Sequence, residues 1–210
     1  MTIRGRAATT GEGRGRPRDP AADDRIMRAA LEEYARSGWS GFSIDGVART
    51  ARVGKSSIYL RWRTKEQLLL DSVRAYASPL TTDIDSGTLL GDLHTLTVSL
   101  LRYFLDPAGW TTVRIAIDSK SSGPMQVLSA QVRPLFLAMS SVILQRAVDR
   151  GEVDAAVCPQ AATEVLFGAV LMHVISLDPD SFDDACANAD DHVAPLVKIV
   201  AGGLSRSIGV

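Results

Sequence analysis

Apolar residues recur every three or four positions along most of the chain, which is the period of an α-helix. The first stripe consists of Ile26, Ala29, Ala30, Tyr34 and Ala35. It follows an acidic pair at residues 23 and 24 and ends at the glycine at residue 38. Because acids stabilise helix starts and glycine favours helix ends, the pattern predicts a first helix between these points.

Three shorter helical patterns follow. Ser43 stands where an N-cap would stand before apolar residues 44, 47 and 48, and that pattern fails at residues 52–54 after about two turns. The period resumes with Ile58 and Trp62, four residues apart. Thr64 and Gln67 then form a capping box, which predicts a fourth helix running to about residue 76.

Five more helical stripes are expected beyond a break at residues 78 and 79. They cover approximately residues 89–104, 110–117, 128–143, 160–177 and 191–205. Pro134 lies inside the third stripe and predicts a kink there. No strand-like alternation is evident, so the fold class expected is all-α, with about nine helices.

The charge is divided unevenly along the chain, although the net charge is only −1. Residues 1–77 contain 15 Lys and Arg against 9 Asp and Glu, whereas the remainder contains 8 against 15. A basic segment suits the neutralisation of phosphates, and the same duplex would repel an acidic domain. We therefore expect nucleic acid to meet only the N-terminal third.

Composition argues against several other classes of site. Cys158 and Cys186 form no C-x-x-C pair and have no histidine cluster nearby, so neither a disulfide framework nor a metal site is expected. The N-terminus lacks the apolar core of a secretory signal. The apolar stretch 165–177 is interrupted and is shorter than the roughly 20 residues of a membrane span. A cytoplasmic protein without membrane contact or cofactor is expected.

Two short helices around a tight turn, the second basic and rich in hydroxyls, are typical of a helix-turn-helix. Lys55, Ser56 and Tyr59 would project from the N-terminal end of the second helix, which reaches base edges in the major groove. Ser43 and Lys65 begin two other helices, where free N–H groups favour a phosphate. Further DNA contacts are expected from Arg52, Ser57 and Arg61.

The alternatives to this interpretation are structural. The two helices could form a surface hairpin without DNA contact, although the charge distribution argues against this. Tyr59 could serve packing alone, and for Trp62, at a position that suits a core aromatic, packing is the favoured interpretation.

The run from Phe42 to Leu68 resembles the N-terminal domain of the TetR family of transcriptional regulators. The spacing of the motif positions follows that family's pattern without a gap: Val47-Ala48, Ala51, Val53, Ile58-Tyr59, Trp62 and Lys65-Glu66. The sequence departs from the pattern at two positions, since Arg52 stands where the family usually has glycine and Gly54 where it usually has serine. The resemblance covers residues 23–77 and implies nothing about effector identity.

An arm, residues 1–20, precedes the first helix and is expected to be disordered and basic, because it has no apolar periodicity. Its Arg14-Gly15-Arg16-Pro17-Arg18 segment is similar to the core of an AT-hook, in which Arg14 and Arg16 would enter a narrow minor groove. The alternative is a solvated, non-specific tail. The other domains expected are a helix-turn-helix DNA-binding domain at 21–63, a connecting helix at 64–78, and a helical effector-binding and dimerisation domain at 79–210.

The last two helices predict a dimer interface. Residues 160–177 are apolar on nearly every face and need cover on all sides, and the final helix carries one clean apolar stripe with Gly202 and Gly203 at its end. The family resemblance implies that these two helices pair with their copies in a four-helix interface. A homodimer would place two recognition helices on a palindromic operator of double-stranded DNA.

Candidate residues for a ligand pocket combine inward helical spacing with unusual shape or polarity. They are Phe104, Trp110, Arg114, Met125, Phe136, Met139, Met172 and His173. Ordinary core packing is the competing explanation for each, and Arg114 would also pair simply with Asp118, four residues on.

The function expected is that of a ligand-responsive, sequence-specific transcriptional regulator, a repressor released from its operator by a small molecule. The alternative is a DNA-binding activator or architectural factor without an effector. An enzyme is not expected, because no catalytic motif appears and the three histidines are scattered.

Overall fold

The computed structural model describes residues 20–77 and 83–204 of the chain, and this part contains helices and no strand. The described residues form ten α-helices and a short 3-10 turn at Pro179–Ser181. The α-helices are α1 (Pro20–Gly41), α2 (Ile44–Ala51), α3 (Lys55–Tyr59), α4 (Lys65–Ala77), α5 (Leu89–Leu105), α6 (Pro107–Asp118), α7 (Gly123–Asp149), α8 (Pro159–Ser176), α9 (Phe182–Ala187) and α10 (Ala189–Leu204). The all-α prediction is therefore confirmed.

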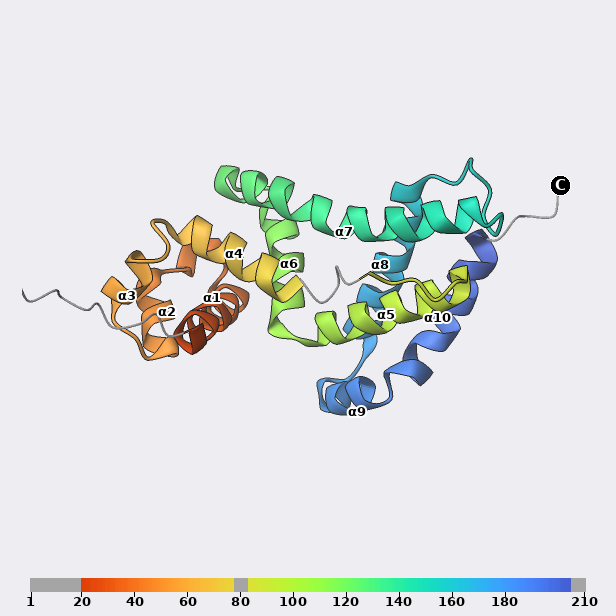
Figure 1. Cartoon of the computed structure of the whole chain (residues 1–210). Helices are drawn as coiled ribbons and strands as arrows, with labels where there is room; N and C mark the ends of the chain where they lie inside the picture. The colour runs from red at the N-terminus through yellow and green to blue at the C-terminus, as the bar shows by residue number, and fades with distance from the viewer. Residues whose placement is uncertain (1–19, 78–82, 205–210) are drawn as a thin grey trace, which may run out of the picture.

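The first three helices form a head at one end of an elongated molecule, with α3 outermost (Figure 1). Tyr34, Phe42, Val47 and Ile58 are almost fully buried and fill the space between these helices. α4 leads from the head to the C-terminal domain, where α5 packs against α8 and α10 while α7 packs against α6 and α8. The buried apolar residues of both parts belong to one continuous core.

The helix caps expected from the sequence are present, with one change. Ser43 Oγ accepts the Gly46 backbone N–H at 3.1 Å, and Thr64 Oγ1 accepts the Gln67 N–H at 3.2 Å. The Gln67 side chain, however, accepts the N–H of Arg63 at 3.3 Å and not that of Thr64. The capping box therefore closes one residue earlier than the sequence pattern predicts.

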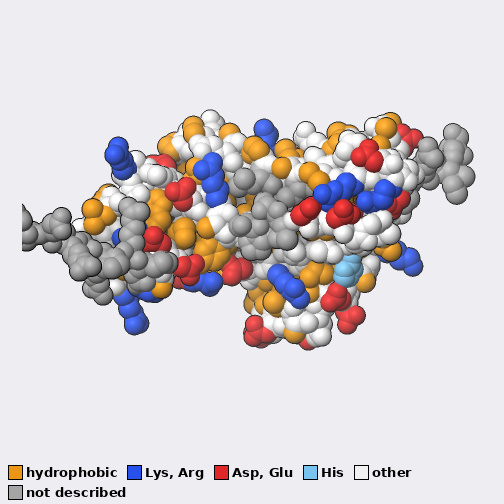
Figure 2. Space-filling model, in the orientation of Figure 1, with side chains coloured by type: hydrophobic (Ala, Val, Ile, Leu, Met, Phe, Trp, Pro, Cys, Tyr) orange, Lys and Arg blue, Asp and Glu red, His pale blue; other side chains and the backbone are white. Residues whose placement is uncertain are grey.

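α7 is a single helix that includes Pro134, as the long stripe in the sequence indicates, and the kink expected at that residue stays a prediction. α9 was not expected, because it has only six residues and buries one of them, Ala185, so it leaves almost no periodic signal. Acidic side chains gather at the edge of the molecule that α9 forms, as Figure 2 shows.

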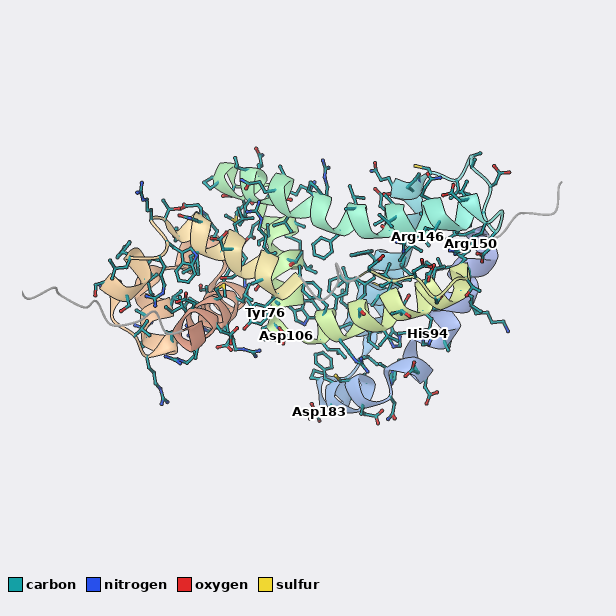
Figure 3. The ribbon with its side chains drawn as sticks, viewed as in Figure 1. Tyr76, His94, Asp106, Arg146, Arg150 and Asp183 are labelled. Carbon is teal, nitrogen blue, oxygen red and sulfur yellow. The ribbon has the colours of Figure 1, made fainter. Side chains whose placement is uncertain are left out.

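The far end of α7 is tied to α5 and to the segment that precedes it by two arginines, which lie side by side in Figure 3. Arg146 donates to Asp83 Oδ1 at 2.7 Å, and Arg150 Nη2 donates to Asp92 Oδ2 at 3.3 Å. Asp92 is fully buried and also accepts hydrogen bonds from the backbone N–H and the hydroxyl of Ser86. A buried carboxylate is tolerated only when paired in this way.

By length and apolar composition alone, α7 could cross a membrane, and so could α8 if it is joined to the segment bent away from it by 111°. The core helices of soluble proteins pass the same test, so it carries little weight here. Both cysteines are exposed and unpaired, and within the described ranges no group of His, Cys, Asp and Glu is suited to a metal ion.

Candidate nucleic-acid interface and adjoining cleft

The turn between α2 and α3 is a Schellman motif with an arginine in the left-handed position. Arg52 has φ 55° and ψ 46°, and it is the one non-glycine residue with positive φ among those described. Its N–H donates to Arg49 O at 3.3 Å, and the next N–H, of Val53, donates to Ala48 O at 3.0 Å. These two bonds are those that define the motif, which usually places glycine here. The departure noted in the sequence therefore occurs at a conformationally demanding position.

α3 presents one buried and one open face. Ile58 is fully buried, whereas Lys55 and Ser56 are exposed and Tyr59 is 54% exposed. Lys55 Nζ lies 2.6 Å from the carboxylate of Asp45 on α2, but both side chains remain more than half exposed. An exposed ion pair of this kind is weak, so the Lys55 ammonium group is free to contact a DNA base instead.

Ser57 and Arg61 are more involved in the head itself. Arg61 Nη1 donates to the Ser57 carbonyl at 2.8 Å, and its Nε forms an ion pair with Asp23 at the start of α1. Both residues are partly buried. The contacts orient the arginine and join the end of α3 to α1.

Lys65 lies at the start of α4 but points back into the head. Its Nζ donates to Phe42 O at 3.0 Å and lies 3.9 Å from the centroid of the Trp39 ring. Such a cation–π contact favours a buried ammonium group. Lys65 therefore supports the loop around Ser43, and its role as a phosphate contact remains a prediction.

Trp62 is 7% exposed, and its Nε1 donates to Asp71 Oδ2 at 3.2 Å. The prediction that it packs is confirmed.

Arg52 also borders a cleft of about 540 Å³, which Arg25, Arg28 and Glu32 of α1 line on the opposite side. The arm with Arg14 and Arg16 lies outside the described residues.

A second cleft, of about 460 Å³, opens between α6, α7 and α8 in the C-terminal domain. Its apolar wall includes Ile115, Val132, Phe136 and Phe167. Its polar residues are Thr112, Ser119, Lys120, Ser129, Arg133, Gln160, Thr163 and Glu164. The volume lies within the range of small-molecule pockets.

Two family models match the chain: bacterial regulatory proteins of the TetR family over residues 26–71, and the tetracyclin repressor-like C-terminal domain over residues 83–192. The second match alone covers more than half of the sequence. The chain belongs to the TetR family. Members of this family are transcriptional regulators that bind DNA through the helix-turn-helix, and this TetR-family protein is therefore a DNA-binding regulator.

Individual relatives agree with this assignment. The chain is 30% identical over 183 residues to the DNA-binding transcriptional repressor TetR of Mycobacteroides abscessus, covering 82% of this chain and 92% of that one. It is 29% identical over 205 residues to an uncharacterized HTH-type transcriptional regulator of Mycobacterium tuberculosis, covering 92% and 95%.

Solved structures share the fold at low identity. A TetR-family regulator from a Rhodococcus species superposes with a TM-score of 0.67 at 13% identity, covering 87% of this chain and all of that one. The regulator FadR of Bacillus subtilis, solved in complex with stearoyl-CoA, superposes with a TM-score of 0.62 at 19% identity, covering 88% and 98%.

The structure does not bring the eight expected pocket residues together. Of the seven whose side chains the structure describes, Phe136 alone lines the α6–α7–α8 cleft. Phe104, 5% exposed, packs behind it against Phe167, with ring centroids 6.4 Å apart. Trp110 is partly buried outside the lining, and Met172 is 60% exposed on α8. The Met139 side chain lies outside the described part of the structure.

Arg114 and Met125 occupy the joint between the head and the C-terminal domain. Arg114 Nη1 donates to Ala35 O of α1 at 2.7 Å, and its Nε lies 3.9 Å from Asp118, so the expected Arg114–Asp118 pair also forms. Met125 is fully buried, with its sulfur 3.3 Å from the hydroxyl of Tyr34. Helical spacing indicated that these side chains face an interior, but not which one.

His173 faces α10 and not the cleft. Its Nε2 lies 3.0 Å from Nδ1 of His192, and burial, followed by the proximity of His192, lowers the pKa of His173. These two histidines are 19 positions apart, so their pairing is not evident in the sequence. Lys120 and Arg133 line the cleft but were not predicted to do so, because an exposed charge is typical of any surface.

Proposed function

We propose that the protein is a dimeric repressor that a small molecule releases from a palindromic operator. The observation that carries the ligand response is the position of α6. One face of this helix lines the cleft through Thr112, Ile115 and Ser119, while other side chains of the same helix hold the head. A ligand that displaces α6 would therefore move the head directly.

The contacts between α6 and the head are specific. Thr111 Oγ1 donates to Leu31 O at 3.0 Å, and the Tyr34 hydroxyl donates to Asp118 Oδ2 at 2.8 Å. Burial and the bond to Asp118 raise the pKa of Tyr34, so its hydroxyl stays protonated and keeps donating. α4 is the helix that connects the two parts along the chain. The packing of α1 against α6 supports α6 as an equal or greater contributor.

At the other edge of the joint, the end of α4 meets α1. Tyr76, labelled in Figure 3, lies at this junction, near the end of α4. The Tyr76 hydroxyl donates to Asp24 Oδ1 at 3.1 Å, and the Arg28 guanidinium lies 5.4 Å from the centroid of the Tyr76 ring. Both α4 and α6 can therefore transmit a shift of the C-terminal domain.

The dimer is proposed to form through α8 and α10. These helices expose large apolar side chains at Val165, Met172, Ile175 and Ile199, which are 51% to 73% exposed. The glycines at 168, 202 and 203 have open space where a Cβ would stand, which leaves room for a partner helix. We expect Met172→Glu with Ile199→Glu to yield monomers in sedimentation experiments. Leu90→Glu, at an exposed position of α5, should remain dimeric.

Within this proposal the domains are a head at 21–63, a connecting helix at 64–78 and an effector-binding and dimerisation domain at 79–210, in a cytoplasmic protein. Lys55, Ser56 and Tyr59 read bases, and Ser43, Arg52, Ser57, Arg61 and Lys65 contact or support contacts to the backbone. One short recognition helix contacts too few bases to select a single operator. Two heads are therefore needed, spaced about 34 Å apart or a multiple of that distance.

Selection of bound sequences from a random DNA pool tests the proposal. We expect enrichment of an inverted repeat, and loss of its binding in Lys55→Ala and Tyr59→Ala, with the exposed C-terminal variant Arg102→Gln as the control. Release of the selected operator would then be screened with small molecules by fluorescence anisotropy. A pool without an enriched repeat, or no release by any compound of a broad screen, would contradict it.

Replacing Arg114 by methionine tests the joint. The variant loses the hydrogen bond to the Ala35 carbonyl, and we expect ligand-driven release of the operator to weaken while operator affinity without ligand changes less. We also expect the free energy of unfolding to fall by about 1 kcal/mol, the typical contribution of one hydrogen bond, because the acceptor is only partly buried. Urea titration and anisotropy measure the two effects. Unaltered release would exclude the contact from the coupling.

A further inference from the structure

We propose that the α6–α7–α8 cleft takes an amphipathic anion: an apolar body that carries one carboxylate, sulfonate or phosphate group. This inference rests on the proposed function, since it names the chemical class of the effector.

The wall of the cleft is aromatic and apolar. Phe136 and Phe167 meet edge to face with centroids 5.5 Å apart, and Tyr103 lies 5.9 Å from Phe136 behind them. Ile115 and Val132, each at most 3% exposed, complete this surface. Such a wall favours the apolar part of a ligand and gives it no hydrogen bond.

The hydroxyl groups of the lining are largely engaged within the protein. Thr163 Oγ1 donates to Pro159 O at 2.7 Å, Ser119 donates to Ala116 O at 2.7 Å, and Thr112 donates to Ala108 O at 3.2 Å. These donors already have acceptors, so they offer little to a neutral polar ligand. Specificity must come from other groups in the lining.

Two cations in the lining supply this specificity. Lys120, two residues past the end of α6, and Arg133 on α7 line the cleft. Among residues 20–77 and 83–204, neither side chain has a hydrogen-bond or ion-pair partner. The single acid of the lining, Glu164, accepts a hydrogen bond from the Gln160 amide at 2.8 Å. The cleft thus combines a net positive rim with an apolar wall, which is the complement of an amphipathic anion.

A matched pair of fluorescent probes separates the two parts of this recognition. 1-Anilinonaphthalene-8-sulfonate carries an anion, and N-phenyl-1-naphthylamine has nearly the same apolar body without it. We expect the full-length protein to bind the sulfonate more tightly. Lys120→Gln and Arg133→Gln should each raise the Kd of the sulfonate by about 2- to 5-fold, as expected for partly exposed charge pairs, and leave that of the neutral probe unchanged.

Two further variants locate the binding and control for charge. Ala116→Trp, which fills the cleft from the α6 side, should weaken both probes, and Arg102→Gln on the surface of α5 should weaken neither. The inference is overturned if neither probe binds, if Ala116→Trp leaves both unaffected, or if the charge variants weaken both probes equally. Operator binding and release, measured in parallel, distinguish that result from failure of the repressor proposal, since both can persist with a neutral effector.

Discussion

Replacing Arg52 by glycine should make the head more stable while lowering its affinity for DNA. Arg52 adopts φ 55° and ψ 46°, a conformation that costs residues with a Cβ roughly 1–2 kcal/mol. Glycine avoids that cost but loses about 0.4–1 kcal/mol through the greater freedom of the unfolded chain. The net expectation is a gain of ~1 kcal/mol in the free energy of unfolding. The two backbone hydrogen bonds of the motif need no side chain and remain.

The effect on DNA binding has the opposite sign. Each dimer loses two exposed cations, and each lost phosphate contact lowers the slope of log K against log salt by roughly 0.9, so a decrease of about 1.8 is expected. Arg52→Lys keeps both the charge and the strain, whereas Arg52→Asn removes the charge and tolerates the left-handed conformation. These two variants separate the effect of charge from the effect of the backbone.

Urea denaturation and anisotropy titrations at several salt concentrations, with the selected operator, measure the two effects. A glycine variant no more stable than the parent would refute the argument from backbone strain. A salt slope that does not change, in both the glycine and the asparagine variants, would refute the phosphate contact.

Two further predictions concern polar side chains that are buried or partly buried. Trp62→Phe removes the hydrogen bond to Asp71 and should lower the free energy of unfolding by ~1 kcal/mol in urea titrations, and an unchanged midpoint would contradict this. The pKa of His173 is lowered by burial and by His192, so below about pH 6.5 the unfolded chain binds more protons and stability falls as the pH decreases. His173→Gln should reduce that fall more than His94→Gln, and equal pH profiles for the two variants would rule it out.

Local signals were sufficient to predict the head. Ser43 and Thr64 cap their helices through bonds to backbone groups three residues away, so their roles depend on sequence neighbours. The burial of Trp62 likewise follows from its four-residue spacing from Ile58. The left-handed conformation of Arg52 could not be predicted, because an arginine there contradicts the usual preference for glycine.

The cleft depends on contacts that no local pattern records. Helical spacing shows that a side chain faces inward, and Met125 and Phe136 satisfy that rule equally well, yet one lies beneath the head and the other lines the cleft. Lys120 and Arg133 both line the cleft only because α6 and α7 converge beside it. Tertiary arrangement, and not residue type, separates a ligand contact from core or surface.

Gly38 carries a consequence for how this regulator can be recombined with its relatives. Its φ of 63° and ψ of −176° lie in a region that is essentially reserved for glycine, and a Cβ there would stand 2.5 Å from Nη2 of Arg114 on α6. The head is thus fitted to a side chain that lies far from it in the sequence. A chimera joined anywhere between α4 and α5 would inherit a foreign α6 beneath its own α1, so the unit of exchange is the head together with the α6 surface that receives it.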